Sequence, residues 1–338
     1  MPFNASLGRL IKWSLASLAA VALAAPAARA ADWPPSGHRM QFVVPFNTGG
    51  SADRLARGLA TFLPKELNDV SITVVNRPGA SGALGAAWFQ QQRDDGSAFL
   101  VMQATPFLAN AILQTDIPVK WEDFDVINTQ WIDYAIVAVP KDSPVKTFED
   151  LITKLRSGPG AASTGAMVGS GAYLQQLGML ELLNIPKENV RFVTYDGGGP
   201  LRTAIAGGHL DFTFAAAQGS EVIRDRIRSI AVVTDKPVKE WDGPLFNEVL
   251  KAKYDVTMPL FSSYTTSVIA HKTFKEKHPE RYKTFVEAYK RTLEREDYQD
   301  WLKQNQIGGE WLGPEESKRL TNEGYEGLKK YSHLAKTN

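Results

Sequence analysis

The regular alternation of short apolar runs with helical segments is the feature that most constrains the fold of this chain. Met40–Phe46 is an apolar run typical of a buried strand, a glycine-rich turn follows it, and residues 51–67 have a helical pattern. Two further strands are expected at residues 70–75 and 98–102, and two further helices at residues 82–92 and 106–113. Strands that alternate with helices in this way form parallel sheets with helices on their faces, so we predict an α/β protein.

The alternation begins again in the second half of the chain. After a strand at residues 124–128, the apolar segment Tyr134–Pro140 is expected to cross between two lobes. In the second lobe we expect helices at 148–156, 170–183, 200–206 and 220–226, and strands at 161–164, 190–195, 210–214 and 227–233. A return strand at 265–270 leads to a helical C-terminal region. One charged helix there carries an apolar stripe that should pack on a core, made of Tyr282, Phe285, Val286, Tyr289 and Leu293.

The length of the chain permits two domains. At 338 residues it can build two separate cores of ordinary domain size. We predict that lobe 1 consists of residues 31–130 plus 255–338 and that lobe 2 consists of residues 131–254. Lobe 1 is therefore expected to be discontinuous in sequence.

The first thirty residues predict export. Arg9 and Lys12 precede an alanine-rich apolar run over Ser14–Ala25, and the small residues Ala28 and Ala30 suit a signal peptidase, so residues 1–30 are expected to be a signal peptide cleaved after Ala30. The apolar run is shorter than the ~20 residues that span a bilayer. Removal of this segment changes the formal charge from +1 to −2, and we expect a soluble, mildly acidic periplasmic protein.

The composition excludes several chemistries. The 38 Lys and Arg residues are balanced by 37 interspersed Asp and Glu residues, so the chain offers no basic field for a phosphate backbone, and we expect no nucleic-acid partner. The chain has no cysteine, which excludes disulfides, thiol nucleophiles and cysteine-ligated metal centres. No two of its five histidines have the i, i+4 spacing of a helical zinc site, so we expect no metal.

No complete catalytic motif is present. Ser170 lies between two glycines, but Val168 and Ala172 stand where a nucleophile elbow requires further glycines. The chain also has no phosphate-binding loop and no dinucleotide fingerprint. We therefore expect no enzymatic activity and no cofactor; a periplasmic hydrolase that uses Ser170 or Asp53 is the less favoured alternative.

Four turns carry the candidate binding residues. Each turn lies between an apolar strand and the start of a helix, so its backbone N–H groups face the crevice at the carboxyl ends of the strands. The candidate ligand-binding residues are Gly49, Gly50, Ser51 and Asp53 in the first turn; Pro78, Gly79, Ala80, Ser81 and Gly82 in the second; Ser163, Thr164, Gly169, Ser170 and Gly171 in the third; and Tyr195, Asp196, Gly197 and Gly198 in the fourth.

These turns favour an anion held from two sides, and a carboxylate fits them well. Helix N-termini and charge-assisted hydrogen bonds can together supply the roughly 8 kcal/mol of a micromolar site. We expect main-chain N–H groups to act together with the hydroxyls of Ser51, Ser81, Thr164 and Ser170. No buried arginine is required, although Arg77 or Arg202 could contribute.

The combined motifs have a family resemblance. Val43-Val-Pro-Phe46-x-x-Gly49-Gly50-x-x-Asp53, Asn76-Arg-Pro-Gly-Ala80-x-Gly82-x-x-Gly85, Tyr195-x-Gly197-Gly-x-Pro200 and Ala206-Gly207-Gly208-x-Leu210-Asp211 together span nearly all of the mature chain. This combination resembles the Bug family of periplasmic substrate-binding proteins of tripartite tricarboxylate transporters. The resemblance implies a two-lobed periplasmic binding protein fold, type II-like, with mixed, mostly parallel sheets and a hinge. It also implies a carboxylated ligand between the lobes and delivery to the transporter's membrane permease subunits.

Departures from the family pattern bear on the ligand. Val75 stands where an acidic residue is usual, Ser81 replaces a glycine, and Asp196 follows Tyr195 where a basic residue is common. An added negative charge beside the cleft disfavours a tricarboxylate. We therefore expect a mono- or dicarboxylate, including an aromatic one if Tyr195 stacks on it. We expect a monomer, and a receptor that signals to a membrane sensor kinase is the alternative to a transport partner.

Overall fold

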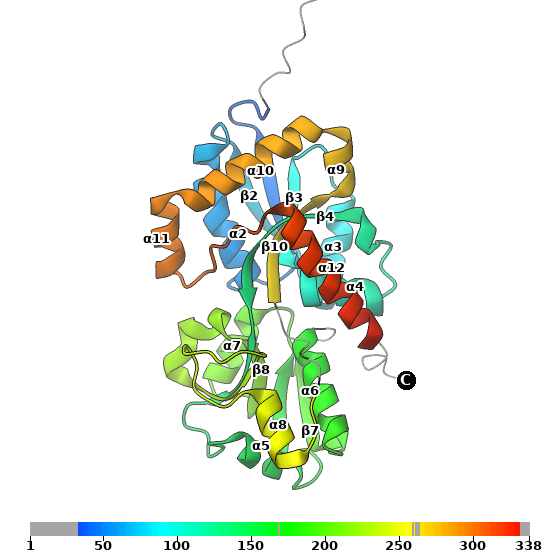
Figure 1. The fold of residues 1–338 in the computed structure, drawn as a ribbon, viewed down its shortest axis with the longest axis vertical. Helices are drawn as coiled ribbons and strands as arrows, with labels where there is room; N and C mark the ends of the chain where they lie inside the picture. The colour runs from blue at the N-terminus through cyan, green and yellow to red at the C-terminus, as the bar shows by residue number, and fades with distance from the viewer. Residues whose placement is uncertain (1–32, 168–169, 259, 261–263, 332–338) are drawn as a thin grey trace, which may run out of the picture.

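The computed structural model describes residues 33–167, 170–258, 260 and 264–331, and these residues form two five-stranded sheets (Figure 1). The predicted signal peptide with Ala30, and Gly169 of the third turn, lie outside the described residues. Helices cover both sheets, and the two sheets lie one above the other in Figure 1. The chain is thus a two-lobed α/β protein.

The first sheet combines N-terminal strands with one strand from much later in the chain. Its order is β2-β1-β3-β10-β4, where the strands are β1 (Arg39–Val44), β2 (Ser71–Asn76), β3 (Ala98–Gln103), β4 (Phe124–Asp133) and β10 (Tyr264–His271). β1 pairs in parallel with β2 and β3, whereas β10 is antiparallel to β3 and β4. The late strand β10 therefore lies in the middle of the sheet that the first part of the chain begins.

The second sheet repeats this plan. Its order is β7-β6-β8-β5-β9, with β5 (Ala135–Pro140), β6 (Ala162–Ala166), β7 (Val190–Thr194), β8 (Phe212–Ala216) and β9 (Ile227–Val233). β6 pairs in parallel with β7 and β8, and β5 is antiparallel to β8 and β9. Both sheets are mixed as predicted, but parallel pairings do not outnumber antiparallel ones, because β10 and β5 run against the strands that flank them.

The helices follow the predicted order. Those on the first sheet are α2 (Ser51–Phe62), α3 (Ala83–Gln90), α4 (Ala109–Gln114), α9 (Lys272–Lys277), α10 (Pro279–Glu294), α11 (Glu296–Gln304) and α12 (Gly313–Tyr331). Those of the second lobe are α5 (Phe148–Leu155), α6 (Gly171–Leu182), α7 (Gly198–Ala206) and α8 (Phe246–Tyr254), with the 3₁₀ segment η6 (Gln218–Arg226). Helix α8 is absent from the sequence prediction, and residues 220–226, predicted as a helix, form part of η6.

Local sequence signals set several of these boundaries. Helix α5 begins with a capping box, in which Asp150 N–H donates to Thr147 Oγ1 at 3.1 Å and Thr147 N–H donates to the Asp150 carboxylate at 3.0 Å. Helix α10 buries the predicted apolar stripe, since Tyr282, Phe285 and Tyr289 are all buried. The periodic signal was therefore sufficient to orient this helix on the core.

The crossing between the sheets lies at Asp133–Tyr134. Strand β4 stays in the first sheet through Asp133, and β5 begins at Ala135 in the second sheet. The segment Tyr134–Pro140 was predicted as a strand that crosses between the lobes; the strand is present as Ala135–Pro140, but it lies wholly in the second sheet. The crossing is therefore much shorter than expected, because both strands are paired almost to their ends.

The C-terminal helices are fastened to β4 by one buried amide. Asn128 Nδ2 donates to Glu310 O at 3.0 Å, and Asn128 Oδ1 accepts the backbone N–H groups of Leu312 at 2.9 Å and Gly313 at 3.0 Å. The Asn128 side chain is fully buried. It satisfies three backbone groups that lead into α12, so the start of this helix depends on it.

We predict that Asn128→Ala lowers the free energy of unfolding by about 2–4 kcal/mol, because three buried backbone groups lose their partner. Urea unfolding measures the loss. Asn322→Ala is the matched control, since the exposed Asn322 side chain accepts a hydrogen bond only from Trp121 Nε1 among the described contacts. Its loss should stay below about 1 kcal/mol. Equal losses in the two variants would contradict the assigned role of Asn128.

Candidate functional site

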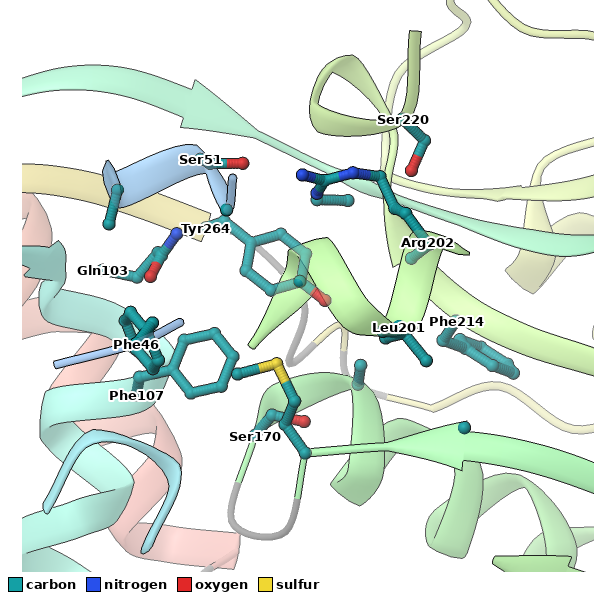
Figure 2. A pocket seen from close by; sticks show the side chains of 18 of the residues that line it. Phe46, Ser51, Gln103, Phe107, Ser170, Leu201, Arg202, Phe214, Ser220 and Tyr264 are labelled. Atoms are coloured by element: carbon teal, nitrogen blue, oxygen red, sulfur yellow. The ribbon is translucent and has the colours of Figure 1, made fainter. Parts of the chain in front are cut away.

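A cavity of about 60 Å³ lies between the two lobes, and residues from both sheets line it (Figure 2). The first lobe contributes Phe46, Gly50, Ser51, Ala52, Gln103, Phe107 and Tyr264. The second lobe contributes Gly165, Ala166, Met167, Ser170, Ala172, Gly198, Leu201, Arg202, Phe214, Ala215, Ala216 and Ser220. The lining residues lie at or after the ends of β1, β3, β6, β7 and β8, whereas the predicted turns follow β1, β2, β6 and β7, so β3 and β8 were not predicted to contribute.

Aromatic and aliphatic side chains form most of the wall. Phe46 and Phe107 meet edge to face with their ring centroids 5.1 Å apart, and Phe107 lies 6.2 Å from the ring of Tyr264. Leu201 and Phe214 close the opposite side (Figure 2). A wall of this kind excludes water and strengthens any electrostatic contact made inside the cavity.

Arg202 places a buried cation in this apolar wall. Its residue exposure is 6%, and Nη2 donates to Gly49 O across the lobes at 2.5 Å. Among the described residues, no carboxylate lies within ion-pair distance of its guanidinium. Burial lowers the pKa of Arg202 to about 10, so the group is still positive at neutral pH. The more distant carboxylate of Asp133 offsets only part of the cost of burying this charge, so the site favours an incoming anion.

Two further polar groups of the lining are buried without a partner. Ser220 Oγ on η6 and Gln103 Oε1 at the end of β3 make no hydrogen bond in the described structure. Ser220 is fully buried, and Gln103 is 7% exposed. Because buried polar atoms normally have partners, these two atoms indicate where a ligand's polar groups go.

The loop after β1 is held from behind by Asp53. Its Oδ2 accepts Gly49 N–H at 2.9 Å, and its carboxylate also receives Arg57 Nη2 at 2.9 Å and Asn76 Nδ2 at 2.9 Å. Burial acts to raise the pKa of Asp53, but these hydrogen bonds outweigh it and lower the pKa below its usual value. Asp53 does not line the cavity; it shapes the loop that does.

The two lobes touch where the first and fourth turns meet. A Cβ atom at Gly199 would lie 2.7 Å from Thr48 O, so only glycine permits this approach. Arg202 of α7 bonds to Gly49 O at the same place. The described conformation is therefore a closed one at this edge.

Of the predicted site residues, Gly50, Ser51, Ser170 and Gly198 line the cavity. Ser170 caps α6, since its Oγ accepts Tyr173 N–H at 3.0 Å. Gly49 takes part through its carbonyl oxygen, and Gly197 is the N-cap of α7. Gly171 is the first residue of α6 and is absent from the lining.

Two predicted hydroxyls are engaged elsewhere. Thr164 Oγ1 donates to Gln176 Oε1 at 2.6 Å, and Ser163 Oγ donates to Asp211 Oδ2 at 2.8 Å. Strand β6 instead reaches the cavity with the residues that follow, beginning at Gly165. The hydroxyl contact expected from Thr164, and any contact from the candidate residue Ser163, are therefore absent from the cavity that the structure describes.

The second turn lies behind the cavity. Pro78, Gly79, Ala80, Ser81 and Gly82 do not line it, and a Cβ atom at Gly82 would lie 3.2 Å from the ring of Phe46. Arg77, considered as an anion ligand, is exposed and lies over the ring of Trp88 at 4.7 Å. This turn supports the wall of the cavity rather than forming it.

Tyr195 and Asp196 of the fourth turn are also outside the lining. Tyr195 is half-buried next to β6, where a Cβ atom at Gly165 would lie 3.3 Å from its ring, and Asp196 is exposed. The stacking of a ligand on Tyr195 therefore stays a prediction without support from the cavity.

Sequence reasoning missed Gln103, Ser220 and the aromatic wall. Gln103 and Ser220 follow β3 and β8, so the rule that selected the other turns applies to them too, although neither turn is rich in glycine. Tyr264 begins β10, which joins the first sheet from a distant part of the chain. No local signal could have placed its ring at this cavity.

The chain matches the family described as "Tripartite tricarboxylate transporter family receptor" over residues 55–311. The chain belongs to this family. It is a family of solute-binding receptors and not of enzymes. The predicted Bug-type relationship of this receptor is thereby confirmed.

Individual relatives agree with the family match. This receptor is 31% identical over 205 residues to the UPF0065 protein in the gbd 5′ region of Cupriavidus necator, and the match covers 58% of each chain. The chain thus spans less than two thirds of the length of that curated relative. The structure of periplasmic binding protein BugD has a TM-score of 0.72 at 19% identity, with 88% of this chain and 97% of that chain covered.

A second solved structure shows the same fold. R. palustris Rpa4515, solved with adipate, has a TM-score of 0.72 at 24% identity, and the match covers 90% of this chain and 98% of that chain. The predicted two-lobed periplasmic binding protein fold is confirmed by these likenesses. Within the described ranges no helix is long and apolar enough to cross a membrane, and no cluster of His, Cys, Asp and Glu could hold a metal ion.

Asp133 ties the lobes of this receptor together at the crossing. The carboxylate is buried: Oδ1 accepts the N–H groups of Tyr134 at 2.8 Å and Gln218 at 2.9 Å, and Oδ2 accepts Gly219 N–H at 2.9 Å. Burial raises the pKa of Asp133 to about 6, although these N–H groups and the charge of Arg202 act in the opposite direction. The last residue of β4 is thereby bonded to η6, the segment that carries Ser220.

We predict that the stability of this receptor, relative to Asp133→Asn, falls as the pH rises from 4 to 7. The pKa of Asp133 is about 6 in the folded state and near 3.9 in the unfolded state, so the folded state binds more protons in this window. The stability contribution is fully present below about pH 4 and is lost as the pH rises through about 6. Urea unfolding of both proteins should show a change of roughly 2–3 kcal/mol in their difference. A difference that is independent of pH would rule out the elevated pKa.

Proposed function

We propose that this receptor captures a small organic carboxylate in the cavity between its lobes and delivers it to the membrane subunits of a tripartite tricarboxylate transporter. The observation that carries the proposal is the buried guanidinium of Arg202, which lines an apolar cavity and has no carboxylate partner among the described residues. A ligand carboxylate would supply the missing counter-ion.

The surrounding backbone supports the same ligand charge. Helices α6 and α7 both begin at the cavity, where Ser170 and Gly198 line it, and helix N-termini carry partial positive charge. Each helix end contributes about 0.3–1 kcal/mol, and each charge-assisted hydrogen bond contributes about 1.5–3 kcal/mol. Arg202, Ser51 and the two helix starts together account for the roughly 8 kcal/mol of a micromolar site.

Closure over the ligand is part of the proposal. Arg202 on α7 bonds to the loop after β1, so a carboxylate beside Arg202 would contact both lobes and favour the closed state. The predicted lobes are residues 31–130 with 255–338, and residues 131–254; in this proposal residues 131–133 go with the first lobe, because β4 pairs with β10 through Asp133. Membrane subunits of the transporter would then distinguish the closed receptor from the open one.

Related proteins support the ligand class and the location. Rpa4515, which shares the fold, was solved with adipate, a carboxylate. The family description names a transporter receptor, and BugD is a periplasmic binding protein. We propose a periplasmic location for this receptor, after removal of residues 1–30, and a solute-binding role without catalysis.

We predict that Arg202→Met weakens the binding of any carboxylate ligand about a hundredfold. Methionine keeps much of the side-chain length but removes the charge and the paired donors, which is a loss of about 3 kcal/mol. Calorimetry on ligand-stripped protein, screened against mono-, di- and tricarboxylates, measures the change.

Arg191→Met is the matched control, because Arg191 is an exposed residue on β7 and does not line the cavity. Its affinity should stay within about twofold of the unmodified receptor. If Arg202→Met binds carboxylates as well as the control does, or if only uncharged solutes bind the unmodified receptor, the proposed function is wrong.

A further inference from the structure

Arg202 is the single charged side chain among the described residues that line the cavity. The charges of Arg54 and Asp133 act on the pKa of Arg202 but do not line the cavity, so a second carboxylate or an ammonium group of the ligand would find no charged partner in the lining. Burial of an unpaired charge in an apolar site costs several kcal/mol. The site thus selects a ligand with one carboxylate and no other charge.

Ser220 stands on the Arg202 side of the cavity. Both come from the second lobe, and Figure 2 shows Ser220 next to Arg202. The unpartnered Ser220 Oγ can donate to a carboxylate that also accepts from the guanidinium. Together the guanidinium of Arg202 and the hydroxyl of Ser220 would hold a ligand carboxylate in one orientation.

Gln103 stands on the opposite wall, at the end of β3 in the first lobe. Its Oε1 is buried and has no partner, although the residue lies among the aromatic side chains of that lobe. A hydroxyl group can donate to the amide oxygen or accept from the amide nitrogen, so it satisfies Gln103 in either orientation of the amide. A purely hydrocarbon tail would leave this amide without a partner.

The size of the cavity limits the length of the ligand. A cavity of about 60 Å³ has room for a few water-sized groups, since one water needs ~10–15 Å³. We expect an acid with a chain of three or four carbons to fit this room better than a long diacid.

We infer that this receptor is selective for short hydroxy acids that carry one carboxylate and no other charge. Arg202 and Ser220 bind the carboxylate, and Gln103 binds the hydroxyl group. The inference rests on the proposed function and narrows its ligand class. This selectivity follows from the positions of two side chains. The Arg202 guanidinium of the second lobe faces the neutral amide of Gln103 in the first lobe across an apolar cavity.

Isothermal titration with ligand-stripped receptor tests the selectivity. The probes are two matched pairs, lactate with propionate and 3-hydroxybutyrate with butyrate, together with malonate and alanine as doubly charged analogues. In at least one pair the hydroxy acid should bind about tenfold more tightly than its partner. Malonate and alanine should bind at least a hundredfold more weakly than lactate.

A variant identifies the group that recognises the hydroxyl. Gln103→Leu should reduce the tenfold preference to less than about threefold, because leucine has no hydrogen-bonding atom. Gln91→Leu, at an exposed position on the C-terminal end of α3, is the matched control and should keep the full preference.

The outcomes separate this inference from the proposed function. If simple carboxylates bind through Arg202 but neither hydroxy acid is preferred, or if malonate binds as tightly as lactate, the selectivity inference is overturned and the receptor role stands. If no carboxylate binds at all, the proposed function itself fails. The comparison of the matched pairs uses the unmodified receptor, so it does not depend on how the variants fold.

Discussion

The structure depends on one buried charge. Arg202 lies in an apolar wall between two lobes, its only described hydrogen bond goes to a backbone carbonyl oxygen, and it stays positive despite its burial. Burial of this cation is costly, and we propose that an anionic ligand offsets the cost. The cavity, the contact between the first and fourth turns, and the N-termini of α6 and α7 all lie around this guanidinium.

Two buried carboxylates hold the parts of the site in place without lining it. Asp53 fixes the loop whose carbonyl accepts from Arg202, and Asp133 fixes η6 at the crossing between the sheets. Their chemical settings differ: hydrogen bonds keep Asp53 ionised, whereas burial raises the pKa of Asp133 toward 6. The site is thus a set of donors whose positions are fixed by acidic residues that do not line the cavity.

Local patterns predicted the elements well because each depends on short-range periodicity and turn chemistry. The strand at residues 227–233 and the helix with the Tyr282 stripe were placed correctly from apolar spacing alone. Helix α8 was missed, and the crossing was displaced, because both depend on how the chain packs between the two sheets. Thr164 was predicted to contribute its hydroxyl, but this hydroxyl bonds to Gln176, because pairing in the second lobe turns the side chain away from the cavity.

By itself, the sequence determined an α/β chain without cysteine, with glycine-rich turns at the carboxyl ends of its strands, because composition and periodicity are local properties. Only the tertiary structure decided which of those turns meet. It brought Arg202 against Gly49 and placed Gln103 and Tyr264 on the facing wall, through strand pairings between distant segments. The charge and polarity of the cavity arise from these contacts between segments far apart in the sequence, so no local sequence pattern encodes them.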